Sequence, residues 1–543
     1  MIEDFSKVNI LIFKNAGCTP CRKVEPVLRQ LVSSNSSNLA TLTIIDTDKE
    51  VDLARRFHID KIPVIYFNDK LILTADETVS LINLDQSSNI ELPFFEENEE
   101  ILGNYSNFNT FFGSNSQSAL FSRLFDEIIR YSADSNSPEL MQRRLKFNML
   151  AISQKTMSIE AFQSVTRSSV GDYVHIGVLQ SIVTSILAIS PRSSAYLYRV
   201  GCDLGRYSNV QSRFLQNFPK IMDDFDDDNK FRDILEGLAE LYSSNSLGLP
   251  LYLASRSIAK PIDSKSALLT VYESAFCAHI SPIDQPVCYL IAGEIAGLVE
   301  IIMGDSVSVV ETKCFGLGDP FCQFEIELGK ERDFTFINER VFLSETEKEK
   351  FQLCLETISK NMYSSSLFRK TLRSGFSDYV HISVLQQTMN GIKFSDPFFT
   401  TLLFYGGFHY GKFGADFAVI ERLMKSMGDA ELPIDFEDSL YVMRSYFNDP
   451  SIILSRWQGK VDLIFEDEET ALLNVYESSI ASGLNMKSSD FSLDVSLETT
   501  LCDFTAGFIQ GRLSRICDEN VKVTEVTCRG LGSKFCQFKI ELD

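Results

Sequence analysis

The sequence CFGLGDPFCQF, from Cys314 to Phe324, recurs near the end of the chain as CRGLGSKFCQF, from Cys528 to Phe538. Apolar residues alternate in the flanking segments SVSVVET and FCQFEIEL, which predicts two strands joined by a glycine-containing turn. Such a hairpin brings Cys314 and Cys322 close together. This stretch alone is compatible with a redox pair, a metal site or a phosphate loop. The residues around it are needed to choose among these three interpretations.

The two copies share four residues that can bind a metal. The shift of 214 positions that pairs Cys314 with Cys528 also pairs Cys288 with Cys502, Glu311 with Glu525, and Cys322 with Cys536. The cysteines without a cysteine counterpart are Cys202, Cys277, Cys354 and Cys517. Three thiolates and one carboxylate fill the tetrahedral shell of zinc and leave no open position, so we expect two structural zinc ions. A cross-strand disulfide, buried thiols without metal and an iron cluster remain alternatives.

The duplication extends well beyond the hairpins. DYVHIGVLQ at Asp172 recurs as DYVHISVLQ at Asp378, and VYES at Val271 recurs at Val475. This internal repeat predicts two similar domains of about 200 residues each after the first segment. An acidic and polar stretch at 91–135 is predicted to link them to a separate N-terminal domain at 1–90.

The N-terminal domain has an α/β pattern of its own. Strands are expected at 8–13, 40–45 and 64–67, and helices after residue 18 and at 51–57. Cys18 and Cys21 form a CxxC motif between the first strand and the first helix. A helix N-terminus favours the thiolate form of Cys18, and Cys21 is placed to resolve a mixed disulfide.

This segment resembles thioredoxin. The resemblance rests on CTPCRKVEP, with a proline at Pro26, and on FHIDKIPVIYFNDKLI, which implies a cis-proline at Pro63 beside the dithiol. It implies a thioredoxin-like fold in which Cys18, Cys21 and Pro63 form the redox site. Gly17 stands where this family usually has tryptophan, and Ile12 where it has a buried acid. A docking module with an idle dithiol is therefore the alternative to a working redox site.

The duplicated domains resemble the 4-vinyl reductase domain. The resemblance rests on PVCYLIAGEIAGL, VVETKCFGLGDPFCQFEIEL and their copies. It implies two domains, at residues 136–329 and 345–543, joined by a linker at 330–344. It implies zinc held by the Cys, Glu-x-x-Cys, Cys pattern, as in the sensor half of phenol-responsive regulators. It also implies an α/β fold related to TRAPP-type trafficking subunits, with an internal cavity for an aromatic or lipid-like guest. The ligand-contacting residues are not identified by the sequence.

Composition excludes some partners. The chain carries 51 basic and 74 acidic residues and a net charge of -23, which disfavours nucleic acid. The N-terminus lacks the basic region of a signal peptide, and the most apolar stretch is interrupted by Glu294 and Glu300. We expect a cytoplasmic protein without a transmembrane segment, in which cysteines bind metal or react more often than they form structural disulfides.

Two other motifs have simpler interpretations. GGFHYGK, at 406–412, approaches a P-loop, but Phe413 replaces the metal-binding hydroxyl. The spacing shared with the first copy is Gly-x-x-x-Gly, which predicts close helix packing. His175 and His381 are equivalent positions on amphipathic segments, where we expect packing rather than ligand contact.

Three functions fit the sequence. The first is a sensor or adaptor whose two zinc-stapled domains bind a hydrophobic small molecule or a partner protein, with the thioredoxin-like domain supplying redox input or docking. The second is a thiol-disulfide oxidoreductase whose duplicated domains hold its client. The third is a TRAPP-like scaffold that assembles through pairing of the duplicated domains or as a homo-oligomer. No catalytic role is expected of the duplicated domains themselves.

Overall fold

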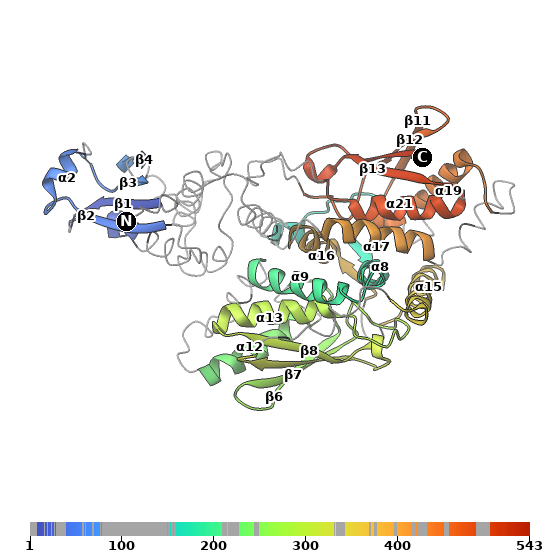
Figure 1. Cartoon of the computed structure of the whole chain (residues 1–543), viewed down its shortest axis with the longest axis horizontal. Coiled ribbons are helices and arrows are strands. Elements are labelled where there is room, and N and C mark those ends of the chain that lie inside the picture. The colour runs from blue at the N-terminus through green and yellow to red at the C-terminus, as the bar shows by residue number, and fades with distance from the viewer. Residues whose placement is uncertain are drawn as a thin grey trace. The chain divides into compact units, whose positions relative to one another are not determined.

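The chain folds into two compact units in this computed structural model (Figure 1). One comprises Met1–Ala151 and Lys487–Leu497, and the other comprises Ile152–Met486 and Glu498–Asp543. The structure describes residues 8–15, 17–18, 20–22, 24–25, 28, 40–56, 59, 61–67, 70–76, 78, 149, 153, 156, 159–208, 214, 227–243, 249–330, 332, 343–368, 371–373, 377–395, 399–414, 420, 432–449, 455–484, 500–517 and 519–542. The predicted linker at 91–135 lies outside these residues. Among them, no helix combines the length and apolarity needed to cross a membrane.

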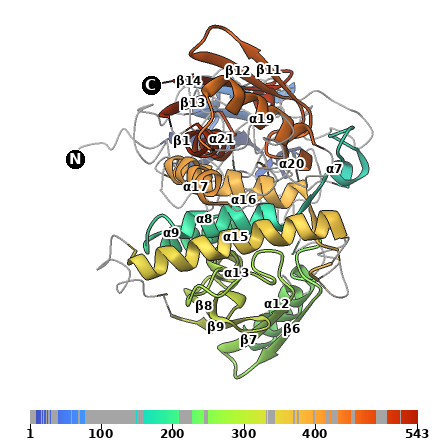
Figure 2. The same ribbon diagram turned by 90° about the vertical axis from the view of Figure 1, so that its right-hand side faces the viewer.

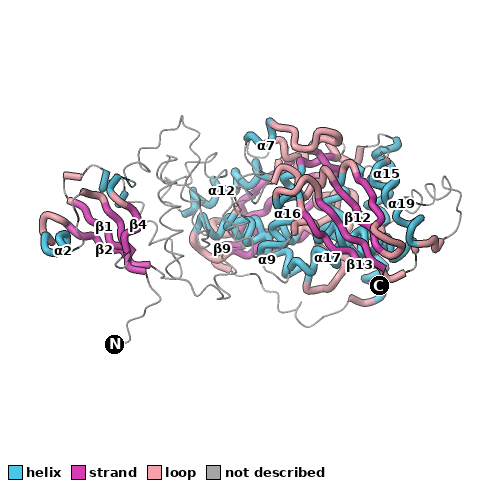
Figure 3. Tube along the Cα trace, turned by 90° about the horizontal axis from the view of Figure 1, so that it is seen from above, coloured by secondary structure: helices cyan, strands magenta, loops and turns pink. Residues whose placement is uncertain are grey.

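The first unit is built on a four-stranded sheet. Its elements are β1 (Val8–Lys14), β2 (Ala40–Asp46), α2 (Val51–Arg56), β3 (Val64–Phe67) and β4 (Lys70–Leu73). The strand order is β2-β1-β3-β4, with β1 parallel to β2 and antiparallel to β3, and β1 and β2 run side by side in Figure 3. Buried Leu11, Phe13 and Ile45 form its apolar core. The expected strands are present, and β4 is an addition to them.

The first copy of the repeat places an antiparallel sheet against helices. Its elements are α7 (Ile159–Gln163), β5 (Tyr173–His175), α8 (Ile176–Leu187), α9 (Ser193–Tyr207), α12 (Asp227–Leu241), β6 (Arg256–Pro261), β7 (Ser266–Tyr272), α13 (Tyr289–Met303), β8 (Val307–Lys313) and β9 (Cys322–Leu328). The sheet order is β6-β7-β9-β8. The burial of β9 alternates along the strand, as the sequence pattern predicts for a strand with one face on the core.

The second copy repeats this architecture. Its elements are α15 (Glu345–Phe368), β10 (Tyr379–His381), α16 (Ile382–Ser395), α17 (Phe399–Phe413), α19 (Phe436–Asn448), α20 (Ser455–Gln458), β11 (Val461–Phe465), β12 (Thr470–Val475), α21 (Asp503–Ile516), β13 (Val521–Thr527) and β14 (Cys536–Leu542). The sheet order, β11-β12-β14-β13, matches that of the first copy. Figure 2 shows α8, α9, α16 and α17 between the two sheets.

Glycines let one helix pair in each copy touch backbone to backbone. A Cβ added at Gly407 of α17 would lie 2.1 Å from the carbonyl oxygen of Phe504 on α21, and one at Gly507 of α21 would lie 2.0 Å from that of Phe404. Gly201 on α9 meets Leu290 of α13 in the same way. GGFHYGK therefore lies inside a helix, and its glycines serve packing, as the sequence predicted, rather than a phosphate loop.

The two copies pair with each other inside the second unit. Strand β5 runs antiparallel to β10, with Val174 opposite Val380. At the ends of this ladder the N–H of Ile176 donates to the carbonyl of Asp378, and the N–H of Ile382 donates to that of Asp172, both at 2.8 Å. These reciprocal bonds relate the copies by an approximate two-fold axis.

Two repeated motifs meet across this axis. Arg167 of the first copy is fully buried and donates to the carbonyls of Trp457 and Glu477, at 3.3 and 3.4 Å. Arg373, its counterpart, donates to the carbonyl of Tyr252 in the first copy at 2.9 Å. Glu477 belongs to the second VYES motif, and each copy anchors the other through the arginine that precedes its DYVH motif.

Candidate metal centres and dithiol

The hairpin β8–β9 positions two thiols of the first cluster. Cys314 follows the end of β8, a single 3-10 turn at Phe315–Leu317 reverses the chain, and Cys322 begins β9. The turn ends at Gly318, whose φ of 92° favours glycine because it has no Cβ. The predicted hairpin is therefore present, and both thiols are buried.

A helix N-terminus and a carboxylate complete the arrangement. Cys288 is the N-cap residue of α13, and its backbone N–H donates to Oε2 of Glu311 at 2.8 Å. The second copy repeats this contact, because the N–H of Cys502, the N-cap of α21, donates to Oε2 of Glu525 at 2.8 Å. The carboxylate thus ties the start of a helix to the neighbouring hairpin in both copies.

The second cluster contains all four residues that the sequence singled out. Side-chain donor atoms of Cys502, Glu525, Cys528 and Cys536 lie within 4.8 Å of one another. The sulfurs of Cys502 and Cys536 are 3.6 Å apart. Tetrahedral zinc with Zn–S bonds of about 2.3 Å places its sulfurs about 3.8 Å apart, so this spacing suits a metal ion.

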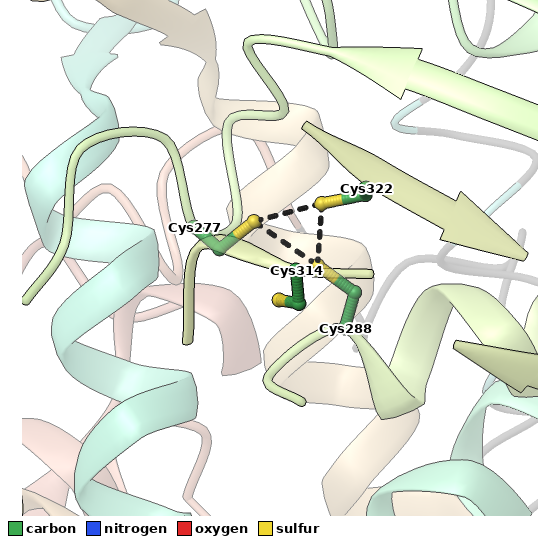
Figure 4. A group of neighbouring side chains, drawn as sticks. All are labelled: Cys277, Cys288, Cys314 and Cys322. Atoms are coloured by element: carbon green, nitrogen blue, oxygen red, sulfur yellow. Dashed lines mark hydrogen bonds between the residues drawn. The ribbon is translucent and has the colours of Figure 1, made fainter. Parts of the chain in front are cut away.

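The first cluster contains a thiol that comparison of the copies passed over. Donor atoms of Cys277, Cys288, Cys314 and Cys322 lie within 4.8 Å of one another. The sulfur of Cys277 lies 3.1 Å from that of Cys322 and 3.3 Å from that of Cys288, and these three sulfurs form a triangle in Figure 4. Comparison of the copies does not identify Cys277, because the second copy has no cysteine at the equivalent position. The sequence feature that could have identified Cys277 is its position, six residues after the start of the duplicated VYES motif.

The polar atoms of both clusters suit a cation. Oε1 of Glu311 and Oε1 of Glu525 are buried without a hydrogen-bond partner among the described residues. Burial raises the pKa of the Glu311 carboxyl and of the Cys288 thiol well above their usual values, and it does the same to Glu525 and Cys502. Burial alone thus disfavours the anionic forms of these groups, and a bound cation would favour them. The residues therefore fit a bound metal ion.

The CxxC motif of the first unit is a disulfide. Cys18 and Cys21 are bonded, and the N–H of Cys21 also donates to the sulfur of Cys18 at 3.1 Å. Described residues 20–22, 24, 25 and 28 are helical, as expected after Cys18. Cys18 is 8% exposed and Cys21 1%, which makes Cys18 the more accessible sulfur. The Ile62–Pro63 peptide bond is cis.

The paired histidines cap helices. Nδ1 of His175, the N-cap of α8, accepts from the N–H of Gly177 at 3.0 Å, and Nδ1 of His381 accepts from the N–H of Ser383 at 3.2 Å. Burial lowers the pKa of His175 to about 3 and that of His381 to about 4, so both are neutral at physiological pH. Their role is to accept hydrogen bonds from N–H groups at the start of the helices that follow β5 and β10.

Family models match parts of the chain. A thioredoxin model matches residues 1–84, and a 4-vinyl reductase domain model matches residues 268–328 and 490–542. Each of the two 4-vinyl reductase segments contains the three thiols and the carboxylate of one predicted zinc set, and the first segment also contains Cys277.

Three proteins of Methanocaldococcus jannaschii are similar to parts of the chain. The chain is 26% identical over 160 residues to an uncharacterized protein of Methanocaldococcus jannaschii, and the match covers 30% of this chain and 79% of that protein. Two further uncharacterized proteins of that organism are matched over 37% and 59% of their own lengths, less than two thirds in each case.

Two solved structures show a partial likeness to the chain. The phenol-responsive sensory domain of the transcription activator PoxR, with phenol, matches at 16% identity and a TM-score of 0.21. That match covers 28% of this chain and 75% of the domain. Subunit 3 of a trafficking protein particle complex from Naegleria fowleri, covalently bound to palmitic acid, matches at 13% identity and a TM-score of 0.20, covering 27% and 81%.

The resemblances drawn from the sequence agree with these matches. The chain carries a thioredoxin domain at its N-terminus, followed by a 4-vinyl reductase domain in two segments.

Proposed function

We propose that this protein is a sensor or adaptor whose paired 4-vinyl reductase domains, each stapled by a zinc ion, receive a hydrophobic small molecule or a partner protein. The thioredoxin domain adds redox input or docking. The observation that carries the proposal is the repetition of one buried donor cluster at the same helix–hairpin junction in both copies. The zinc would hold that junction closed, because four protein ligands leave no position for substrate chemistry.

The packing offers a route by which one copy can influence the other. Cys288 is the N-cap of α13, and this helix touches the backbone of α9 at Gly201. Helix α9 in turn contacts the second copy, since Asp203 accepts a hydrogen bond from Ser395 of α16 at 2.8 Å. A guest that displaces α13 would therefore also strain the pairing of the copies. In this proposal the strain is passed on to a partner protein.

Native mass spectrometry of the full chain from its own cells tests this proposal. We expect the mass of one chain with two zinc ions and an added apolar molecule. Phenol and palmitic acid serve as added probes, because a guest that binds only the folded state raises the unfolding temperature as its concentration exceeds its dissociation constant. A zinc-loaded chain that carries no guest or partner and whose unfolding temperature neither probe raises would overturn the sensor proposal.

The bonded pair in the first unit favours one alternative, a thiol-disulfide oxidoreductase. In the reduced protein the Cys18 thiolate would attack a client disulfide, forming a mixed disulfide and releasing one client thiolate. Cys21 would then attack the mixed disulfide, which forms the Cys18–Cys21 bond and releases the second client thiol. The client is thereby reduced by two electrons and the protein is oxidised. Pro63 would lie beside this pair, as the resemblance to thioredoxin implies.

A further inference from the structure

The two metal clusters differ at one position that follows the VYES motif. Counting from the start of that motif, Cys277 in the first copy corresponds to Ala481 in the second. The first cluster therefore has five candidate donors, four thiols and Glu311, whereas the second has three thiols and Glu525. Tetrahedral zinc accepts four of them, so one donor of the first cluster is left over.

Geometry favours Cys277 over Glu311 as the fourth ligand. The sulfur of Cys277 is fully buried and lies 3.1 Å from that of Cys322 and 3.3 Å from that of Cys288, near enough for one ion to bind all three. Its sulfur belongs to a set of four whose members are all within 4.8 Å of one another, a set that the carboxylate of Glu311 does not enter.

Among the residues that the structure describes, the second copy has no such choice. Ala481 offers no donor, and the hydroxyl of Ser478, from the same segment, lies 3.6 Å from the Cys502 sulfur. Glu525, unlike Glu311, belongs to a set of four donors together with the three thiols of its own copy. The carboxylate must complete the shell there.

We propose that the first copy binds its metal through four thiolates, Cys277, Cys288, Cys314 and Cys322, with Glu311 as a positioning residue, whereas the second uses three thiolates and Glu525. This inference rests on the proposed metal sites and adds that they are chemically unequal. Softer, all-sulfur ligation favours thiophilic ions, so the first site retains zinc longer against a chelator and takes up cadmium preferentially. The second site, which has one oxygen ligand, is expected to exchange its zinc ion first.

X-ray absorption spectroscopy at the zinc edge of the full chain tests the donor sets. With both sites filled, we expect an average of about 3.5 sulfur and about 0.5 oxygen ligands per zinc. In Cys277→Ala, Glu311 takes over and the average becomes about 3 sulfur and about 1 oxygen. In Ala481→Cys, the second site can gain a fourth sulfur, and the average rises toward about 4.

The two glutamates give a matched pair of controls. Glu311→Gln is expected to leave the sulfur average unchanged and two zinc ions bound, because this residue is not a ligand. Glu525→Gln is expected to lower the zinc content toward one ion per chain and to raise the sulfur average of what remains toward about 4. If both glutamates had a purely structural role, the two substitutions would lower stability but would not differ in the number of sulfur ligands per zinc.

A measurement on the unsubstituted chain tests the inference even if the variants fail to fold. Its cadmium-loaded form should give two cadmium NMR resonances, one characteristic of four sulfurs and one of three sulfurs with an oxygen. Two zinc ions with about 3 sulfurs each, unchanged in Cys277→Ala, would overturn this inference and leave the proposed metal sites standing. A chain that binds no metal would overturn both.

Discussion

Arg167 of the first repeat donates a hydrogen bond to the backbone carbonyl of Glu477 in the second repeat, at 3.4 Å, from a fully buried position. The side chain of Glu477 in turn accepts from Ser168 and from the N–H of Ser169, at 3.2 and 3.1 Å. Burial lowers the pKa of Arg167 to about 10, and the charges of Asp172 and Glu477 oppose that shift. The guanidinium therefore stays charged at neutral pH and ties the copies together.

Removing this guanidinium should destabilise the paired unit. Arg167→Ala leaves Asp172 and Glu477 without their buried cationic partner, so we expect the free energy of unfolding to fall by about 3 kcal/mol. Trp457 is the single tryptophan, is fully buried in the second copy and reports unfolding in urea by its fluorescence. Lys360→Ala, which removes an exposed pair on α15, should change the same quantity by less than about 0.5 kcal/mol. Equal effects of the two substitutions would refute the anchoring role.

The helix crossing of the second copy should not tolerate a side chain. Gly407→Ala puts a methyl group 2.1 Å from the carbonyl oxygen of Phe504, so α17 and α21 must separate, at a cost of about 2 kcal/mol. Tyr405→Ala alters an exposed side chain of the same helix and should change stability by less than about 0.5 kcal/mol. Urea unfolding followed at Trp457 compares them, and an unaffected Gly407→Ala protein would contradict the close crossing.

Stability should depend on pH through Glu294 of α13. Burial raises the pKa of this carboxyl from 4.5 to about 7, although Tyr242, which donates to it at 2.9 Å, opposes the shift. The folded state then holds the proton more tightly than the unfolded state. Its contribution is therefore fully present below pH 4.5 and is lost as pH rises through about 7.

The comparison of wild type with Glu294→Gln isolates this dependence. The full shift corresponds to ~3 kcal/mol, and partial solvent exposure of the side chain reduces the expected difference to about 2 kcal/mol. Unfolding free energies from about pH 5.5 to about pH 8 should show the wild type losing stability relative to Glu294→Gln. Tyr242→Phe should move the window to higher pH. A difference between wild type and Glu294→Gln that does not vary with pH would show that the pKa is not raised.

The dithiol should act through Cys18. In Cys21→Ser the resolving thiol is missing, so reduced protein mixed with a disulfide-bonded client should accumulate a mixed disulfide at Cys18. Cys18→Ser should trap far less, because Cys21 is 1% exposed. Non-reducing electrophoresis and mass spectrometry measure the adducts. If neither variant traps a client at any accessible potential, the CxxC is a docking element and the oxidoreductase alternative fails.

Local sequence patterns predicted more of this molecule than its long-range contacts. The strands of the first unit follow from alternating apolar runs, and the helix crossing follows from Gly-x-x-x-Gly at matching positions in the copies. The pairing of β5 with β10 joins Val174 to Val380, far apart in the sequence, and no local pattern specifies it. The buried contact of Arg167 with Glu477 could not be predicted from the sequence for the same reason. The duplication of VYES and DYVH does not indicate which residues of the two motifs meet.

The metal clusters also show that long-range contacts are difficult to predict from the sequence. Comparing the copies found Cys288, Glu311 and their counterparts, because residues kept in both copies stand out. It could not find Cys277, since the second copy has Ala481 at that position. Only the fold, which brings the segment after β7 beside the start of α13, places this thiol 3.3 Å from Cys288.

The most direct test of the account is the metal content of the full chain purified without oxygen. We expect two zinc ions per chain by elemental analysis, because each copy supplies a complete buried donor set. Cys536→Ser should reduce this to one, since the described part of the second copy offers the cluster no spare donor. Cys322→Ser should retain more zinc through Cys277 and Glu311. A wild-type chain that is folded, has every donor reduced and holds no zinc after reconstitution would contradict the central claim.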